Sequence, residues 1–468
     1  MAPALVIHGH FYQPPRENPW TDEIDPQPSA APYHDWNERI HAECYGPNAN
    51  NYARINFNFG PTLLSWLVKH HPATYQGILA ADQESLVARG NHGNAIAQAY
   101  GHAILPLCND RDRLTQVVWG LADFRFRFGR EAESLWLPET AANDEVLALL
   151  IEQGLRYVIL APNQAKGVID TGQPYLFRHP DGSGRSLSVF FYNGPVAQAI
   201  AFEGALASSQ GLVEKFIAAA RLSDLVHVAT DGETFGHHFK FGDLCLAHAL
   251  EVEAPKAGFW ITNYGEYLDH NPPKQEVEID NGPDGLGTAW SCVHGVGRWW
   301  RDCSCHTGGE PGWNQQWRQP LRAALNFLRD EAAVQFESDC TGLLREPWAA
   351  RNDYIGVILD REHIQDEFLV RHAQRPLSNL EVSRVWKWME LQRSALLMFT
   401  SCGWFFSDLA GIETIQIMRY AARVVDLQEQ LGLQPALEKF LEMLSEAKSN
   451  RPEKGNGADI FLGYAQPR

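Results

Sequence analysis

The sequence has no long apolar segment. It contains no run of roughly 18 or more apolar residues, and its first residues lack the basic and apolar regions of an export signal. Because these features are absent, we expect no membrane span and no export. Cysteine is scarce as well, with 8 residues in a chain of 468, which does not suit a disulfide framework. We therefore expect a reduced, cytoplasmic protein.

Positive charge is also in short supply. Lys and Arg total 39 against 57 Asp and Glu, which gives a net charge of −18. Such a chain repels phosphate backbones and anionic membranes, so we expect neither nucleic acid nor a membrane as partner, and a neutral substrate is favoured. The 15 Trp and 14 Tyr offer flat faces that suit sugar rings, although core packing uses the same residues.

Short apolar runs alternate with longer amphipathic segments, a pattern typical of a parallel α/β barrel. We expect strands over Ala4–His8, Leu135–Leu137, Tyr157–Leu160, Leu187–Tyr192, Leu225–Ala229 and Phe259–Thr262. Between two of them, residues 143–153 predict a helix that Asn143 or Asp144 caps and that Gly154 ends. The predicted fold class is α/β.

The composition changes after this region. From Asp269 to Leu286 the chain is rich in Pro, Gly, Asn and Asp, which marks a domain boundary or a long loop. Beyond it, apolar residues recur at helical spacing, as at Val382, Val385, Trp386 and Met389, and again at Leu437, Phe440, Leu441 and Leu444. We therefore predict a catalytic barrel over residues 1–275 and an α-helical domain over 276–468.

Two carboxylates stand where α/β enzymes keep their chemistry. Glu139 follows the apolar run that ends in Leu137, and Asp231 follows the run that ends in Ala229. Each should emerge at the carboxyl end of a parallel strand. His8 and His10 are two residues apart on a predicted strand, so both can face one pocket.

A cysteine-rich loop is the remaining candidate for chemistry. Cys292, Cys303, Cys305 and His306 lie close in sequence, but their spacing departs from the paired Cys-x-x-Cys knuckles of structural zinc sites. We therefore expect reduced thiols in an aromatic-rich loop and no metal.

Five segments, taken in order, resemble glycoside hydrolase family 57, an α-amylase-like family. They are His8–Pro14, His92–Gln98, Trp136–Glu139, Asp231–His237 and Trp290–Trp300. The second segment departs from the family, which commonly has a glutamate where this chain has Ala95, Ala97 and Gln98. With Asn58–Thr62 and the Cys303–Cys305 loop, the arrangement is most similar to a poorly characterised subgroup with a C-terminal helical domain of unknown function. Its members tend to be longer, so we expect this chain to lack a C-terminal part.

The resemblance implies an incomplete seven-stranded barrel followed by an α-helical domain that contributes loop 290–300 to the active site. It implies a retaining glycosidase or transglycosylase that hydrolyses, transfers or branches α-glucans such as amylose, glycogen and maltooligosaccharides, without a metal or other cofactor. Glu139 would attack the anomeric carbon and Asp231, with a raised pKa, would protonate the departing oxygen, at a carboxyl separation of about 5–5.5 Å. The implied substrate contacts are His8, His10, Gln13, Trp136, Glu233, His237, His238, Trp290 and Trp300.

Three alternatives stay open. Glu233 lies two residues from Asp231 and would face the same side if the strand continued, so it competes for the role of acid. His8, His10 and Asp231 could instead hold a metal, as in amidohydrolases or sugar deacetylases. Against this, the segments predicted at the barrel mouth offer no obvious bridging Lys, and no two His residues are four apart. The irregular second segment also suits a glucan-binding protein that has lost catalysis.

Overall fold

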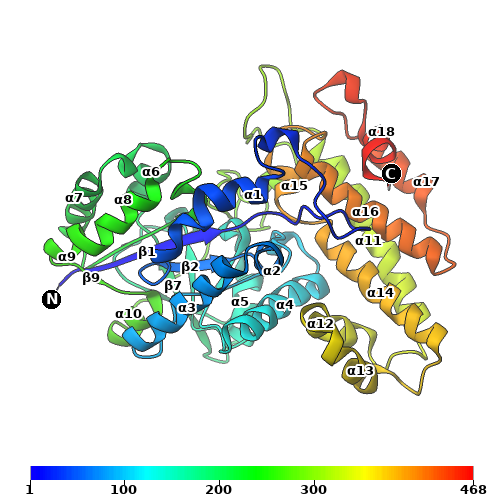
Figure 1. The fold of residues 1–468 in the computed structure, drawn as a ribbon, viewed down its shortest axis with the longest axis horizontal. Helices are drawn as coiled ribbons and strands as arrows, with labels where there is room; N and C mark the ends of the chain where they lie inside the picture. The colour runs from blue at the N-terminus through cyan, green and yellow to red at the C-terminus, as the bar shows by residue number, and fades with distance from the viewer. Residues whose placement is uncertain (1, 467–468) are drawn as a thin grey trace. The chain divides into compact units, whose positions relative to one another are not determined.

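We describe the protein from a computed structural model, which defines residues 2–466 (Figure 1). The chain divides into two compact units. The first contains the chain up to Gln13 together with Pro26–Ala99 and Phe124–Trp290, and the second contains Pro14–Asp25, Tyr100–Asp123 and the chain from Ser291 onward. Two segments that precede residue 275 thus belong to the second unit. The segment of changed composition, Asp269–Leu286, lies near the end of the first unit, and it does not reveal these earlier excursions.

The first unit is an α/β structure. Its strands are β1 (Ala4–Phe11), β2 (Asn56–Phe59), β3 (Ala97–Gln98), β4 (Leu135–Trp136), β5 (Tyr157–Leu160), β6 (Tyr175–Arg178), β7 (Ser186–Phe191), β8 (Leu225–Asp231) and β9 (Trp260–Ile261). Its helices are α1 (Trp36–Ile40), α2 (Pro61–His70), α3 (Pro72–Ala88), α5 (Asp144–Glu152), α6 (Gly194–Phe202), α7 (Ser209–Ala220), α8 (Gly242–His248), α9 (Ala254–Lys256) and α10 (Tyr264–His270). α4 (Asp110–Phe128) runs from the second unit into the first.

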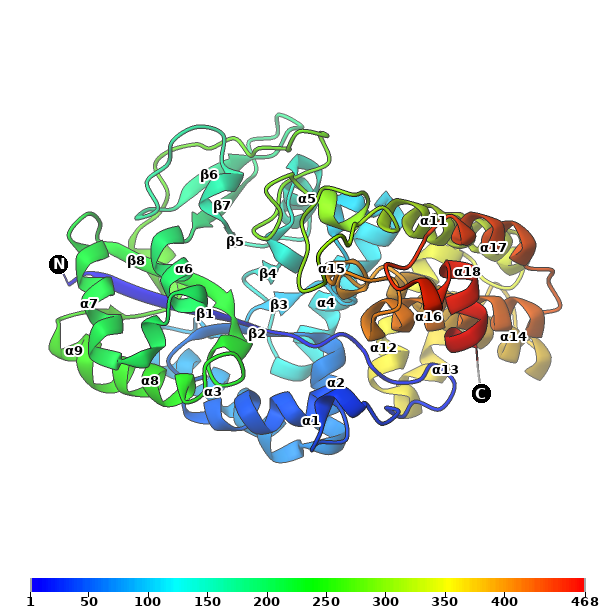
Figure 2. The same cartoon turned by 90° about the horizontal axis from the view of Figure 1, so that it is seen from above.

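Parallel pairing dominates this unit. β1 is buried along its whole length and pairs in parallel with β8, β2 and β9, and parallel ladders also join β3 to β4 and β5 to β7. Single parallel bridges, Phe57 to Ala95 and Ser134 to Tyr157, connect these ladders. Figure 2 shows β8, β1, β2, β3, β4, β5 and β7 following one another in this order. The expected parallel pairing is confirmed in these ladders.

Local sequence signals account for α5. Asn143 has extended backbone angles, and its side chain accepts a hydrogen bond from the backbone N–H of Val146, as a helix N-cap does. Gly154 follows the last turn at a φ of 77°, a left-handed conformation that glycine adopts without steric cost. Both predicted signals are confirmed.

The sequence analysis did not predict three of the strands, β2, β3 and β6. β2 alternates Asn with Phe, and asparagine is depleted in strands, so the segment does not stand out as an apolar run. β3 has only two residues, and β6 pairs antiparallel with β7 outside the pattern of parallel ladders. Tertiary pairing, rather than local preference, defines these elements.

The second unit is mainly helical. It contains α11 (Arg318–Cys340), α12 (Pro347–Leu359), α13 (Arg361–His372), α14 (Asn379–Leu397), α15 (Cys402–Phe405), α16 (Ile412–Gln430), α17 (Leu437–Ser445) and α18 (Gly457–Ile460). α11, α14 and α16 pack against one another (Figure 1), and Val385 and Met389 of α14 are fully buried there. Within residues 2–466, no helix has the length and apolar character needed to cross a membrane.

Candidate active site

Glu139 sits on a strained turn at the end of β4. A 3₁₀ turn over Pro138–Thr140 follows the strand, and Glu139 has φ 58° and ψ 22°. Thr140 also has a positive φ, 52°. Two successive non-glycine residues in the left-handed region are uncommon, and such strain tends to gather at functional sites. The turn directs a half-buried carboxylate out of an otherwise buried segment.

Trp290 holds this carboxylate. Its indole N–H donates to Oε2 of Glu139 at 3.0 Å, and its backbone N–H lies within hydrogen-bonding distance of the Glu139 carbonyl and the Thr140 hydroxyl, each at 3.1 Å. Two residues earlier, Thr288 pairs with Ala142 through two backbone hydrogen bonds of 3.0 Å. These hydrogen bonds join Trp290 to the Glu139 segment and orient the carboxylate, and the expected stacking of Trp290 on a sugar ring stays a prediction.

His8 and His10 form a neutral pair beside Trp136. Both rings stack on the Trp136 indole, with centroids 4.6 and 5.0 Å away, so the two histidines do face the same side of β1. Asn58 contacts both, at 3.0 Å from Nε2 of His8 and 2.9 Å from Nδ1 of His10. Burial lowers the pKa of His8 to about 4, and burial together with the neighbouring His8 lowers that of His10 to about 3.

Two of the expected substrate contacts are buried. His8 and Trp136 are almost fully buried, and Asn56 and Asn58 lie within 3.4 and 3.0 Å of the two ring nitrogens of His8. Both side chains are closed off from solvent in this structure, and their direct contact with a sugar stays a prediction. In the structure, the Trp136 indole packs against the rings of both histidines.

Asp231 ends β8 directly opposite His10. The two residues are register partners on neighbouring parallel strands, so their side chains point to the same side. Asp231 is exposed to solvent, yet desolvation by the surrounding protein raises its pKa well above its usual range, and the carboxylates of Glu233 and Glu139 act in the same direction. Contact with solvent reduces the part of this pKa rise that desolvation causes, whereas the neighbouring charges add to the rise. An aspartic acid that keeps its proton at high pH suits proton donation.

Glu233 is placed differently from Asp231. β8 stops at Asp231 and a 3₁₀ turn follows, so the alternation that would put both carboxyl groups on one side does not continue. Glu233 is buried, and its Oε1 accepts hydrogen bonds from the Tyr12 backbone at 3.0 Å and from the Tyr45 hydroxyl at 2.6 Å. Burial raises the pKa of Glu233 to about 7. The structure thus gives Glu233 a buried carboxyl group with two protein donors, and its direct contact with substrate stays a prediction.

Gly232 explains how this turn closes. A Cβ atom at this position would lie 2.3 Å from the ring of Phe11, so glycine is needed between Asp231 and Glu233 for the turn to pack against this ring. The turn thereby separates an exposed carboxyl group from a buried one.

The remaining predicted contacts are more dispersed. His237 bonds the Glu43 carboxylate through Nδ1 and meets Trp36 edge-on at 6.0 Å, while His238 is exposed. The Gln13 amide donates to the Tyr12 carbonyl at 2.9 Å. Trp300 belongs to the second unit, and its contact with substrate stays a prediction.

Sequence reasoning gave no role to three neighbours of these groups. Asn58 also donates to Gln98 Oε1 at 2.7 Å, which links β1, β2 and β3 through side chains. Tyr45 fixes Glu233, and Tyr192 lies close enough to Asp231 for the aspartate to raise its pKa. The alternation of Asn and Phe over residues 56–59 is a signal that could have revealed Asn58. The two tyrosines carry no comparable local signal.

Comparison with known proteins places the chain in a family. The model described as "Glycosyl hydrolase family 57" matches residues 37–280, more than half of the chain. The chain belongs to this family. A second model, "Domain of unknown function (DUF3536)", matches residues 313–468.

Individual relatives are more distant. Alpha-amylase 1 of Dictyoglomus thermophilum is 24% identical over 128 residues, which cover 26% of this chain and 18% of that protein. The 4-alpha-glucanotransferase of Thermococcus litoralis is 30% identical over 107 residues, 23% of this chain and 15% of that one. The chain thus matches less than a fifth of the length of these two relatives. The structure of an exo-type maltose-forming amylase from Pyrococcus sp. ST04 superposes with a TM-score of 0.68 at 16% identity, covering 94% of this chain and 82% of that one, which shows a shared fold.

Proposed function

We propose that this family 57 member is a retaining glycoside hydrolase or transglycosylase of α-glucans. The observation that carries the proposal is the presence of two carboxyl groups, Glu139 and Asp231, at the carboxyl ends of β4 and β8, where they interact electrostatically. Desolvation raises the pKa of Asp231, and the charges of Glu233 and Glu139 add to this effect. Membership of the family, and the amylase and glucanotransferase among the relatives, support α-glucan as the substrate class.

The two groups would divide the reaction. Glu139, oriented by the indole N–H of Trp290, attacks the anomeric carbon and forms a glycosyl-enzyme ester. Asp231 gives its proton to the departing glycosidic oxygen, and then takes a proton from the water or sugar hydroxyl that opens the ester. His10, held neutral by burial, donates a hydrogen bond to a sugar hydroxyl.

The scaffold belongs to the same proposal. We propose that β8, β1, β2, β3, β4, β5 and β7 form the incomplete seven-stranded barrel of the family. Parallel ladders and parallel bridges that link these strands in a single order support this arrangement. The predicted catalytic domain of residues 1–275 and helical domain of residues 276–468 follow the two units except over residues 14–25, 100–123 and 276–290.

The metal-dependent alternative has weaker support. Both ring nitrogens of His8 lie beside asparagine amides, so a metal shared with His10 and Asp231 would have to displace one of these contacts. The paired carboxyl groups, in contrast, need no rearrangement to interact. No specific observation favours a binding protein without catalysis.

The test is product analysis. Purified protein is incubated with amylose, glycogen or maltoheptaose, and the products are separated by chromatography, with the Glu139→Gln protein as a matched control. Shorter, longer or branched chains that the wild type forms and the variant does not would support the proposal, and their lengths would distinguish hydrolysis from transfer and branching. Unchanged glucans would contradict it. Parallel samples with EDTA address the alternative, because a metal-dependent hydrolase would stop while still folded.

A further inference from the structure

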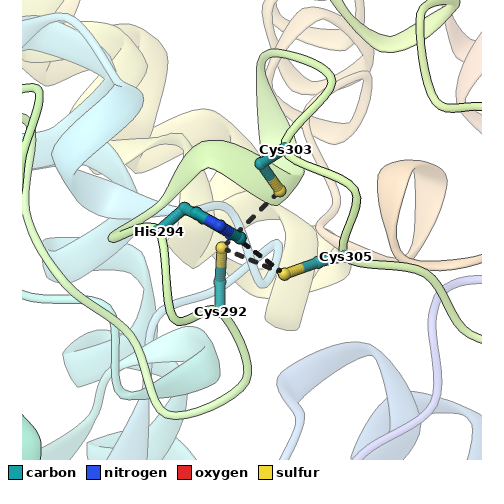
Figure 3. Close-up of side chains that lie close together, drawn as sticks. All are labelled: Cys292, His294, Cys303 and Cys305. Atoms are coloured by element: carbon teal, nitrogen blue, oxygen red, sulfur yellow. Dashed lines mark hydrogen bonds between the residues drawn. The ribbon is translucent and has the colours of Figure 1, made fainter.

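A cluster of three cysteines and one histidine precedes α11 in the second unit (Figure 3). Cys292, His294, Cys303 and Cys305 each contribute one ligand atom, and these four atoms lie within 4.8 Å of one another. Among residues 2–466, they are the only group of three or more His, Cys, Asp or Glu side chains gathered in this way. We propose that the cluster binds one Zn²⁺ ion as a structural site.

The spacing of the atoms matches tetrahedral zinc. Zn–S bonds of about 2.3 Å and a Zn–N bond of about 2.0–2.1 Å place two sulfur atoms about 3.8 Å apart and sulfur about 3.6 Å from nitrogen. In the structure, Sγ of Cys292 lies 3.8 Å from that of Cys303 and 3.9 Å from that of Cys305. Sγ of Cys305 lies 3.4 Å from Nδ1 of His294. Three independent separations therefore agree with one shared ion.

The backbone supports the ligand sulfurs. The backbone N–H groups of His294 and Arg298 lie close enough to the sulfur of Cys292 to stabilise its thiolate, and that of Cys305 is placed in the same way beside the sulfur of Cys303. Such outer contacts orient metal thiolates and moderate their charge. Cys292 and Cys303 are buried, while His294 and Cys305 are half-buried, so an ion here would be shielded on one side and reachable from the other.

The charge of a nearby arginine also supports a zinc ion at this site. Three thiolates and one Zn²⁺ leave a single negative charge. Arg318, at the start of α11, is fully buried and lies close enough to Cys303 and Cys305 to interact with both electrostatically. It donates to the Cys305 carbonyl at 2.7 Å, but its Nε and Nη2 have no hydrogen-bond partner within the described part of the chain. A buried cation of this kind requires compensation, which an anionic zinc site would provide.

The surrounding chain shows what the ion would do. Between Ser291 and Trp317 the regular structure is limited to one short 3₁₀ turn, Gly297–Trp299. A connection of this length rarely stays ordered without support of its own. Four protein ligands fill the coordination shell of a structural zinc, so we assign the ion to folding and not to catalysis.

His294 takes the place expected for His306. Nδ1 of His306 lies 3.1 Å from the Gly308 carbonyl, and the side chain is exposed. The ligand pattern is therefore Cys292-Val293-His294 followed by Cys303-Ser304-Cys305. Single-residue spacers explain why the expectation of no metal, based on the Cys-x-x-Cys pattern, missed this site.

The experiment measures metal in the intact protein. After expression with added zinc and removal of loose metal by gel filtration, elemental analysis should give about one zinc per chain. His294→Ala and Cys303→Ser should lose most of it, whereas His306→Ala and Cys245→Ser, which change a neighbouring histidine and a distant cysteine, should keep it. Circular dichroism records whether each variant is folded.

A titration of the wild type covers variants that fail to fold. An organomercurial is added stepwise, and released zinc is followed with a chromophoric chelator, so that zinc release should track the modification of three thiols. Protein without zinc, a disulfide among these cysteines in the intact mass, or equal zinc in His294→Ala and His306→Ala would overturn the proposal. None of these readouts depends on glucan activity.

Discussion

Replacing Trp290 with phenylalanine should slow the reaction by removing one hydrogen bond. The indole N–H is the donor to Glu139 Oε2 at 3.0 Å, and phenylalanine keeps an aromatic ring against Trp136 but has no donor. The backbone hydrogen bonds of residue 290 do not depend on its side chain. The substitution therefore tests the donor with little change to the loop.

The size of the effect follows from the type of bond. A hydrogen bond to a charged group contributes about 1.5–3 kcal/mol, which corresponds to a rate change of about 10- to 150-fold. Trp290 is half-buried, so water can replace part of the lost donor. We expect kcat/KM to fall about 10- to 30-fold, at the lower end of that range.

The assay is the initial rate on maltoheptaose, with kcat and KM determined separately. Trp260→Phe is the matched control, because Trp260 is also half-buried in the first unit but lies away from the carboxylates, beside Tyr267 and His270. It should stay within about twofold of the wild type. If Trp290→Phe behaves like this control, the hydrogen bond does not act on the reacting carboxylate, and the orienting role is wrong.

Three further predictions follow from the same geometry. Asp231→Asn should abolish turnover of natural glucans but keep first-step activity on maltosyl fluoride, whose leaving group needs no proton; equal loss on both would count against the acid role. Glu233→Gln removes a like charge that raises the pKa of Asp231, so this pKa should fall. The basic limb of the pH profile of kcat/KM should then move to lower pH, and a limb that stays in place or moves to higher pH would contradict this coupling. The pKa of His8 in the folded protein is about 4, below its usual 6.5, so between these pH values the unfolded chain binds more protons than the folded one. The stability that a neutral His8 contributes should therefore be complete above about pH 6.5 and decline as the pH falls towards 4, as urea unfolding can measure. A His8→Asn protein with the same decline would refute that origin.

Much of the site could be anticipated from sequence because it depends on strand ends. Apolar runs locate β4 and β8, and the residues that follow them include Glu139 and Asp231. The same reasoning failed for Glu233, since strand alternation cannot be extended past a turn whose presence depends on the packing of Gly232 against Phe11.

Contacts between residues far apart in the sequence could not be predicted from local sequence patterns. Trp290 and Glu139 are 151 residues apart, and a tryptophan in a loop suggests stacking more readily than a hydrogen bond to a carboxylate. The burial of His8 likewise depends on Asn56 and Asn58 of β2, a strand that its own residues barely signal.

Trapping the glycosyl-enzyme intermediate would show whether Glu139 is the residue that forms it. The protein is treated with a 5-fluoro-α-maltosyl fluoride, which slows the second step, digested with pepsin, and analysed by mass spectrometry to locate the added sugar. We expect a label on Glu139 that is absent from the Glu139→Gln protein. A label on Asp231 or Glu233, or turnover of the reagent without any covalent adduct, would contradict it.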